Sequence, residues 1–310
     1  MKNTEKIAVC SRSFSKNKIL RSELLVRYEN VTFNDSGLQL EGIELVNFLS
    51  GHTKAIIGLE RMDEFVLSRL PELKVIGKYG VGLDLIDLDS MRKFNKRLGW
   101  TSGVNKRSVS ELVISFMIEM LHRIPAASRE VLSGTWRQHV GNLLTGKTIG
   151  IIGCGNIGKD LVKLLQPFEC PILVHDIRQY IEFYNQYKIK AMGLEELLTN
   201  ADVVTLHIPL DNTTRGILSK KRIELMKPTA ILINAARGGL VDESALKAVL
   251  KEGRLAGAAF DVFSSEPPQD MELIQFPNFL ATPHIGGSAE EAILAMGRAA
   301  IEGLDQNATP

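Results

Sequence analysis

A glycine-rich turn is the feature that most constrains the fold of this chain. The apolar run 149–152 leads directly into Gly153-Cys154-Gly155-Asn156-Ile157-Gly158, and a helical pattern with an apolar face follows. A GxGxxG string alone is weak evidence, but between a strand and a helix each glycine has a mechanical task. The first permits a tight turn, the second lets the backbone approach a pyrophosphate, and the third lets the helix pack closely on the strand. We therefore predict that a dinucleotide binds at the start of this helix, through Gly153, Gly155, Asn156, Ile157 and Gly158.

An acidic residue at the end of the next predicted strand narrows the choice of dinucleotide. Asp176 lies eighteen residues past Gly158, where a carboxylate reaches the adenosine ribose hydroxyls. The alternative interpretation is that Asp176 only caps a loop. A carboxylate repels a 2′-phosphate, so we predict NAD rather than NADP as the cofactor. Arg178, two residues further on, would offset this preference in part.

The alternation of short apolar runs with longer helical patterns predicts parallel α/β architecture. From residue 147 onward the rhythm is regular and predicts a doubly wound Rossmann domain, with strands at 148–152, 172–175, 203–207, 230–233, 257–261 and 279–281. A separate α/β unit precedes it, with strands at 6–10, 55–57, 74–76 and 98–101 and helices at 40–49, 62–70 and 87–94. A long apolar-striped helix over 108–123, entered through Asn105 and Ser108 as caps and closed before Pro125, joins two domains or forms part of a dimer interface. A last helix over 289–304 is expected to pack back on the N-terminal domain.

Charge and cysteine content exclude several function classes. The chain has 37 basic and 36 acidic side chains without long single-sign runs, so we expect neither a nucleic-acid nor a membrane partner. It shows no signal-peptide pattern and no apolar run of bilayer length, and we expect a cytoplasmic protein. Cys10, Cys154 and Cys170 form no CxxC pair and have no histidine at zinc spacing, so we interpret them as reduced structural residues and expect no metal.

Ionisable residues at three later strand ends suggest hydride-transfer chemistry. Arg237, Glu266 and His284 each follow a predicted strand, and ligands of open α/β sheets bind at the carboxyl ends of strands. Reduction of a 2-oxo acid requires a guanidinium for the carboxylate, a proton donor for the carbonyl oxygen and a partner that keeps this donor protonated. Arg237, His284 and Glu266 fit these three roles in that order. Each also has a simpler interpretation: a surface arginine, a loop glutamate or a histidine that satisfies a backbone group.

Together these segments resemble the D-2-hydroxyacid dehydrogenase family over nearly the whole chain. The match includes the stretches 77–84 and 105–111 as well as the three strand-end motifs. The resemblance implies that Arg237, Glu266 and His284 are catalytic. It further implies cofactor contacts by His207, Pro209, Ala235, Asp261, His284 and Gly286, with Asp261 at the nicotinamide carboxamide. Substrate would bind at Lys78, Tyr79, Gly80, Val81 and Gly82, whose backbone N–H groups hold the carboxylate, and at Arg237.

The resemblance also implies a domain division and an assembly. Residues 1–102 with 287–310 would form a flavodoxin-like α/β substrate domain, and 103–286 the NAD-binding Rossmann domain. We expect a homodimer. Because the sequence stops at 310, we expect no C-terminal regulatory domain and no serine feedback through one. Formate dehydrogenases of the superfamily carry glutamine where this chain has Glu266, which argues against formate as the substrate.

Two functions remain open at this point. The first is reversible NAD(H)-linked interconversion of a D-2-hydroxy acid and its 2-oxo acid, as in phosphoglycerate dehydrogenases and hydroxypyruvate or glyoxylate reductases. Lys78 would favour a phosphate or second carboxylate on the substrate, unless it is a solvent-facing lysine. The second is an NAD-sensing binding protein like the corepressors that share the fold, although this chain lacks their extended tail. A hydrolase is disfavoured because the sequence has no GxSxG elbow and no HExxH.

Overall fold

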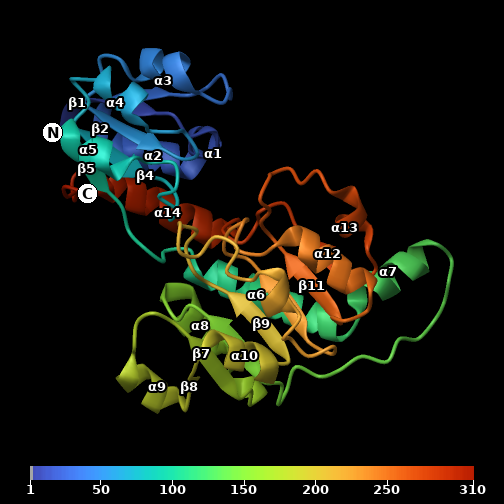
Figure 1. The fold of residues 1–310 in the computed structure, drawn as a ribbon. Helices are drawn as coiled ribbons and strands as arrows, with labels where there is room; N and C mark the ends of the chain where they lie inside the picture. The colour runs from blue at the N-terminus through green and yellow to red at the C-terminus, as the bar shows by residue number, and fades with distance from the viewer. Residues whose placement is uncertain (1–2) are drawn as a thin grey trace. The chain divides into compact units, whose positions relative to one another are not determined.

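A computed structural model describes residues 3–310, and contacts within it divide the chain into two compact units (Figure 1). Unit 1 comprises the chain up to Asn105 together with Ala289–Pro310, and unit 2 comprises Lys106–Ser288. Both units are α/β, as predicted, and each has its own parallel sheet. Among residues 3–310, no helix combines the length and the apolar character needed to cross a membrane.

Unit 1 is built on a five-stranded parallel sheet in the order β2-β1-β3-β4-β5. This is the flavodoxin-like strand order, whose switch point lies between β1 and β3. Each strand of this sheet except the edge strand β2 was predicted. The strands are β1 (Asn3–Val9), β2 (Tyr28–Phe33), β3 (Lys54–Ile57), β4 (Val75–Lys78) and β5 (Arg97–Gly99).

Helices cover both faces of this sheet. One face packs on α3 (Gly42–Leu49), α4 (Glu64–Ser68) and α5 (Leu88–Lys93), all three of which were predicted. The other face packs on α1 (Arg12–Lys16), α2 (Lys18–Arg27) and α14 (Glu290–Gly303). The sequence analysis missed α1 and α2.

The last helix, α14, is an integral part of unit 1. It lies against β4 and β5, and glycines on both strands permit the approach. A Cβ atom on Gly77 would lie 2.6 Å from the Ala300 carbonyl oxygen, and one on Gly99 only 2.0 Å from that of Gly303. The expectation that this helix packs on the N-terminal part of the chain is therefore confirmed.

Unit 2 contains a seven-stranded parallel sheet in the order β12-β11-β10-β9-β6-β7-β8. Numbered from β6, this is the Rossmann strand order with one further strand, and the order in which strands are added to the sheet reverses between β6 and β9. The strands are β6 (Ile149–Ile152), β7 (Ile172–His175), β8 (Lys190–Ala191), β9 (Val203–Leu206), β10 (Ile231–Asn234), β11 (Gly257–Phe260) and β12 (Phe279–Ala281).

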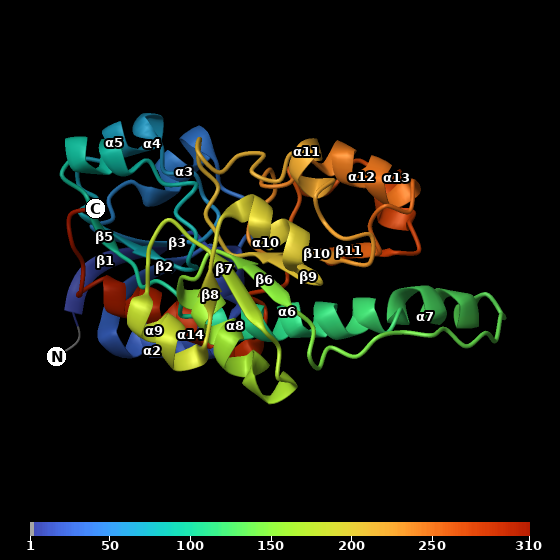
Figure 2. The same cartoon turned by 60° about the horizontal axis from the view of Figure 1, so that its bottom comes forward.

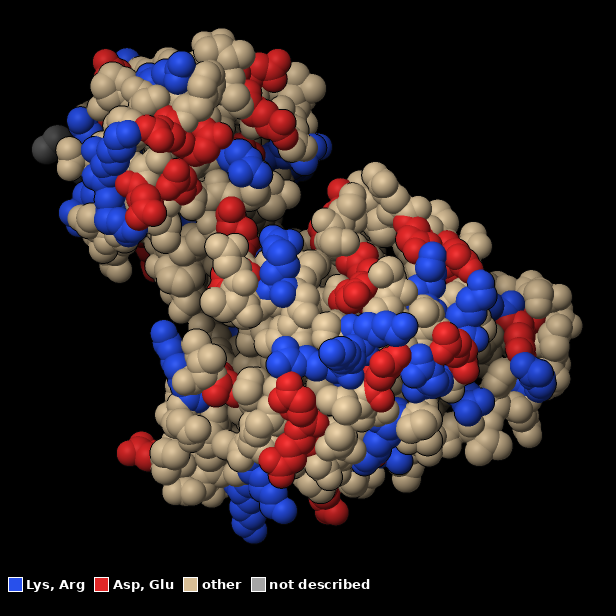
Figure 3. Space-filling model, in the orientation of Figure 1, with Lys and Arg blue, Asp and Glu red and all other residues tan. Residues whose placement is uncertain are grey.

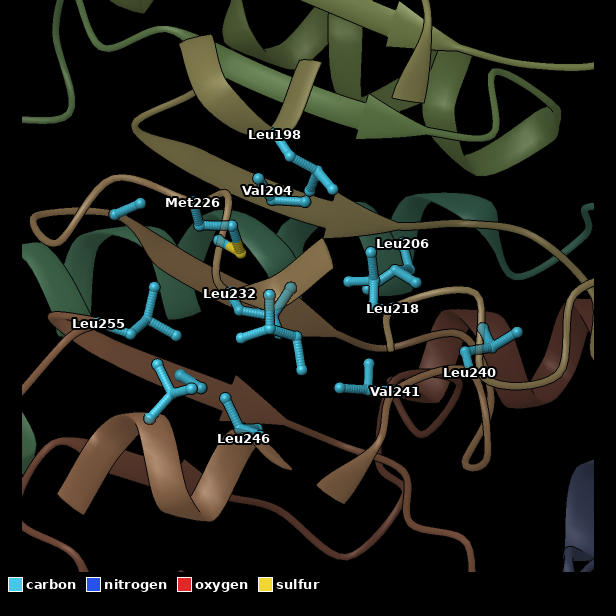
Figure 4. Packing of buried hydrophobic residues seen from close by; sticks show 14 of the residues in the cluster. Leu198, Val204, Leu206, Leu218, Met226, Leu232, Leu240, Val241, Leu246 and Leu255 are labelled. Atoms are coloured by element: carbon cyan, nitrogen blue, oxygen red, sulfur yellow. The ribbon is translucent and has the colours of Figure 1, made fainter. Parts of the chain in front are cut away.

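Helices also cover both faces of the second sheet (Figure 2). One layer contains α6 (Lys106–Leu121), α8 (Asn156–Leu165) and α9 (Ile181–Tyr187), and a 3-10 turn over Gln166–Phe168 follows α8. The opposite layer contains α10 (Leu194–Asn200), α11 (Lys220–Ile223), α12 (Glu243–Lys251) and α13 (Met271–Gln275). Leucine, valine and methionine side chains of this second layer and of the strands interdigitate in the core (Figure 4).

The long predicted helix differs from the expectation at both ends. It begins at Lys106, so Ser108 lies in its first turn rather than at a cap, where the Ser108 hydroxyl donates to the Gly286 carbonyl at 2.6 Å. It ends at Leu121, and Pro125 lies in the first turn of a further helix, α7 (Ile124–Leu132). Proline fits there because the first turn of a helix leaves its N–H groups unpaired.

Candidate active site

The predicted site residues of unit 2 follow neighbouring strands at one edge of its sheet. Because all the strands are parallel, their carboxyl ends meet at this edge. Along the sheet, from one side to the other, the residues are His284 after β12, Asp261 and Glu266 after β11, Arg237 after β10, His207 after β9, Gly153 after β6 and Asp176 after β7.

The glycine turn has the geometry expected of a dinucleotide site. Gly153 has a φ of 97°, and a Cβ there would lie 2.6 Å from the His207 carbonyl oxygen. A Cβ on Gly158 would lie 2.3 Å from the Gly153 carbonyl oxygen, so this glycine lets α8 pack on its strand. At Gly155, by contrast, a Cβ would meet no described atom within 4 Å. The protein itself does not require glycine at this position, whereas a bound pyrophosphate at the start of α8 would.

Asp176 is attached to the same turn. One carboxylate oxygen accepts the Cys154 N–H at 2.6 Å, and the other accepts the Arg178 N–H at 2.8 Å. These bonds use two of about four acceptor positions on the carboxylate, so ribose hydroxyls can still donate to it. Burial, followed by the charge of Asp176, raises the pKa of Cys154 to about 11. The thiol therefore stays protonated, which agrees with the structural role predicted for this cysteine.

His207 lies beside the turn as a neutral imidazole. Its backbone N–H donates to the Ile152 carbonyl at 2.7 Å, and its Nε2 is 3.0 Å from the Thr205 hydroxyl. Nδ1 is buried and has no hydrogen-bond partner within residues 3–310. Burial lowers the pKa of His207 to about 3. A buried polar atom without a partner, next to the glycine turn, suits a position that a bound cofactor completes.

Low pH is expected to destabilise the protein through His207. The unfolded chain takes up a proton at this histidine as pH falls below about 6.5, whereas the folded protein does so only near pH 3. The contribution to stability is therefore complete above pH 6.5 and falls by up to about 1.4 kcal/mol per pH unit between 6.5 and 3. Urea unfolding at pH 7 and pH 5 should show a smaller loss for His207→Gln than for the wild type. Equal losses would contradict the assignment.

His284 and Glu266 form a direct pair. His284 Nδ1 and Glu266 Oε2 are 2.8 Å apart, and both side chains are about half exposed. The other oxygen of Glu266 accepts the Phe263 N–H at 3.1 Å, which fixes the orientation of the carboxylate. With Nδ1–H bonded to a carboxylate, Nε2 is left as the exchangeable position of the ring.

Asp261 holds the loop that carries His284. Its carboxylate is buried and accepts three hydrogen bonds: from the Thr282 hydroxyl at 2.6 Å and from the N–H groups of Ile285 and Gly286, each at 2.7 Å. The Asp261 carbonyl also accepts the His284 N–H at 2.9 Å. These bonds keep His284 in the left-handed region at a φ of 55°, which is uncommon for a residue other than glycine.

The loop with Arg237 is packed against the Glu266 loop. The Asn234 side chain bridges it, because Oδ1 accepts the Ala236 N–H at 3.2 Å and Nδ2 donates to the Arg237 carbonyl at 2.9 Å. Arg237 Nη1 donates to the Ala236 carbonyl at 2.7 Å. A Cβ on Gly238 would lie 1.9 Å from the Phe263 carbonyl oxygen, so only glycine permits this approach.

Other predicted cofactor residues differ in exposure. Ala235 is buried at the end of β10, and Pro209 is exposed three residues after β9. At the start of α8, Asn156 is exposed and Ile157 is half-buried. Gly286 lies against Asp261, where a Cβ would meet the carboxylate at 3.0 Å.

The predicted substrate loop of unit 1 follows β4. Gly80 has a φ of 117° and requires glycine, and the Val81 carbonyl accepts the Trp100 indole N–H at 3.0 Å. Tyr79 departs from the prediction. Its ring packs edge-on against Phe14 in the core, and its N–H donates to the Ile57 carbonyl at 2.8 Å. The Tyr79 N–H therefore continues the hydrogen bonding of the sheet. The predicted ligand contacts of this loop are then left to the N–H groups from Gly80 to Gly82.

Lys78 is buried, so the solvent-facing alternative is wrong. Its ammonium group donates to the Gly58 carbonyl, while the Gly58 N–H donates to a Glu60 carboxylate oxygen at 2.6 Å. Both charged side chains are almost fully buried, at 6% and 5% exposure. Burial raises the pKa of Glu60, and the Lys78 charge opposes this shift. The lysine thus belongs to a buried charge cluster beneath the glycine loop.

Several residues of the site escaped the sequence analysis. Asn234 and Thr282 orient the loops that carry Arg237 and His284, and Glu60 accompanies Lys78. For Asn234 and Thr282 the sequence did offer a signal, because each is a polar residue at the end of a predicted strand. Glu60 gave none, because its partner is distant in the sequence.

The fold of unit 2 and the residues at its strand ends define a Rossmann-type dinucleotide-binding domain. Residues 114–286 match the family model described as "D-isomer specific 2-hydroxyacid dehydrogenase, NAD binding domain". The chain belongs to the D-isomer specific 2-hydroxyacid dehydrogenase family, and its cofactor is NAD.

Individual relatives agree with this assignment. The chain is 39% identical to the D-3-phosphoglycerate dehydrogenase of Methanocaldococcus jannaschii over 76% of its length and 46% of the relative. It is 32% identical to the glyoxylate reductase of Thermococcus litoralis over 89% of its length and 86% of that protein. A solved structure of a putative D-isomer specific 2-hydroxyacid dehydrogenase from Polaromonas sp. JS6 66 has a TM-score of 0.89 at 27% identity, covering 98% of this chain and 96% of that one. The match spans about half the length of the D-3-phosphoglycerate dehydrogenases of Methanocaldococcus jannaschii, Bacillus subtilis and Archaeoglobus fulgidus.

Proposed function

We propose that this protein is an NAD(H)-dependent dehydrogenase that interconverts a D-2-hydroxy acid and its 2-oxo acid. The observation that carries the proposal is the 2.8 Å contact between His284 Nδ1 and Glu266 at the carboxyl edge of the Rossmann sheet. The contact orients the His284 imidazole as an acid–base group at the edge of the sheet. In Rossmann domains the nicotinamide of a dinucleotide lies at this edge. Family membership supports the same reaction.

Each residue then has a defined task in the reduction. Bound NADH supplies the hydride that the carbonyl carbon receives. His284 gives the proton to the carbonyl oxygen from Nε2, so a 2-oxo acid, NADH and a proton yield the 2-hydroxy acid and NAD⁺. Glu266 orients the imidazole for this transfer through its contact with Nδ1. Arg237 binds the carboxylate through its planar guanidinium. Within unit 1, Gly80, Val81 and Gly82 are the residues that we propose to bind substrate through their backbone N–H groups.

The cofactor contacts proposed for unit 2 follow its strand ends. Gly153 to Gly158 hold the pyrophosphate, and Asp176 accepts the ribose hydroxyls. The negative charge of Asp176 would repel the 2′-phosphate of NADP at this position, which favours NAD over NADP. His207, Pro209 and Ala235 line the nicotinamide side, and Asp261, Gly286 and His284 complete it.

A panel of 2-oxo acids with NADH tests the proposal. Glyoxylate, hydroxypyruvate and phosphohydroxypyruvate should be compared by the loss of NADH absorbance. We expect clear turnover of at least one of them. An NAD-sensing protein of the corepressor type would bind NADH but oxidise it with none of the acids, and this result would replace the enzymatic function by the sensing one. The face shown in Figure 3 carries interspersed charges of both signs, which suits a small-molecule substrate.

We also propose that the protein forms a homodimer in the cytoplasm. Helix α7 has no buried residue, and with the segment that follows it projects from unit 2 (Figure 2). Leu132, Trp136 and Val140 on this arm are between 86% and 88% exposed, as is typical of an interface with a second copy. Light scattering should report a dimer for the wild type and a monomer for Trp136→Glu/Val140→Glu. Val26→Glu, at an exposed position of unit 1, is the control. Cell fractionation tests the location.

A further inference from the structure

Glu243 makes a contact with the Glu266 loop that the reaction as described does not use. It is the first residue of α12, directly after Asp242, whose carboxylate caps the helix by accepting the Ala245 N–H at 3.0 Å. One Glu243 carboxylate oxygen accepts the Ser264 N–H at 2.8 Å. The contact joins a helix to a loop twenty-one residues further along the chain.

The Ser264 N–H is next in sequence to the N–H that orients the catalytic pair. Phe263 donates its N–H to Glu266 Oε1 at 3.1 Å, and Glu266 Oε2 contacts His284. Two successive N–H groups of one turn thus bind two different carboxylates. A rotation of the Ser264 peptide would also change the direction of the Phe263 peptide and the position of the Glu266 side chain.

The turn is packed against the protein core on one side and exposed to solvent on the other. Helix α12 is anchored by Ala245, Leu246 and Val249 in the core, and Gly238 presses on the Phe263 carbonyl. The residues from Ser264 to Pro267, however, are exposed. An exposed segment is the part of a loop that moves most easily.

We infer that Glu243 is a positioning residue, whose carboxylate oxygen holds the Phe263–Glu266 turn and thereby keeps Glu266 opposite His284. The inference deepens the proposed dehydrogenase function and rests on it. Glu243 itself has no place in the proton transfer. Its hydrogen bond instead links the start of α12, which follows the connection that carries Arg237, to the loop that carries Glu266.

A purely structural role for Glu243 makes a different prediction. An acidic residue in the first turn of a helix stabilises that helix through its charge. Glutamine at 243 loses this charge but keeps an oxygen that can accept the Ser264 N–H. Alanine loses both. The two substitutions therefore distinguish the positioning role from the charge effect.

Steady-state kinetics of Glu243→Gln and Glu243→Ala test the inference in the full-length protein. We expect Glu243→Ala to lower kcat roughly 10- to 100-fold, since small displacements of catalytic groups have effects of this size. The affinity for NADH, measured by fluorescence titration, should stay unchanged. Glu243→Gln should retain kcat within about threefold of the wild type, because a neutral acceptor still forms the bond. Glu252→Ala, at the opposite end of α12, is the matched control and should resemble the wild type.

Hydrogen exchange of the segment 262–266 provides a readout that does not depend on turnover. Exchange should accelerate in Glu243→Ala and stay slow in Glu243→Gln. Equal kcat values for Glu243→Ala and the wild type, or equal exchange rates, would overturn the inference, as would equal losses of kcat in both variants. If the wild type reduces no 2-oxo acid, the proposed function fails, while the exchange data still decide whether Glu243 holds the turn.

Discussion

Replacing His284 by asparagine is expected to lower kcat/KM for the preferred 2-oxo acid by about 10²- to 10⁴-fold. The imidazole is the group that Glu266 orients at 2.8 Å, and asparagine cannot supply a proton to a carbonyl oxygen. The rate should be followed by NADH absorbance at saturating cofactor. Because the pyrophosphate and ribose contacts proposed for Gly153 to Gly158 and Asp176 are untouched, the loss of NADH affinity should be much smaller than the loss of kcat/KM.

A second histidine of unit 2 provides the matched control for this prediction. His122 is exposed just after α6, so His122→Asn should turn over like the wild type. Glu266→Gln should lie between the two histidine variants, because the glutamine oxygen can still accept from His284 Nδ1, but as a neutral and weaker acceptor. A His284→Asn protein with unchanged turnover would remove this residue from the mechanism.

Replacing Lys78 by methionine is expected to destabilise unit 1 by about 3–5 kcal/mol. The change removes a buried ammonium group whose charge, together with that of Arg12, favours the ionised form of the buried Glu60 carboxylate. It also deprives the Gly58 carbonyl of a hydrogen-bond donor. Urea unfolding at neutral pH, followed by circular dichroism, measures the loss.

The double variant Lys78→Met/Glu60→Gln shows whether the two charges are coupled. If they are, the double variant should be more stable than Lys78→Met alone, because no unpaired charge stays buried. Lys74→Met serves as the control. This lysine is exposed directly before β4, and its ammonium group donates to the Pro71 carbonyl. Losses that simply add in the double variant would show that the two side chains act independently.

The nucleotide end of the site could be predicted from the sequence because its signals are local. A glycine turn, the strand before it and the helix after it occupy one short stretch, and Asp176 ends the next strand. Glu266 and His284 were also found, each in the loop that follows a strand. Their mutual contact required the order of the strands, because β11 and β12 are neighbours only in the folded sheet.

Features that depend on distant partners were missed or misjudged. Helix α2 exposes Ile19, Leu25 and Val26, so its apolar residues do not mark a single buried face. Strand β2 lies at the sheet edge with most of its side chains exposed or half-buried, which weakens its pattern. Lys78 resembled a surface lysine because the neutralising Glu60 follows another strand. The residues next to Lys78 in the sequence do not indicate that Glu60 lies near it in the fold.

The close contact of Gly99 with Gly303 has a consequence for biosynthesis. A ribosome delivers α14 only after every residue of unit 2 has been made, yet the sheet of unit 1 needs this helix to cover β4 and β5. Unit 2 is continuous in sequence and can complete its core first. The earliest part of the chain must therefore wait, with one face of its sheet uncovered, until the last helix emerges.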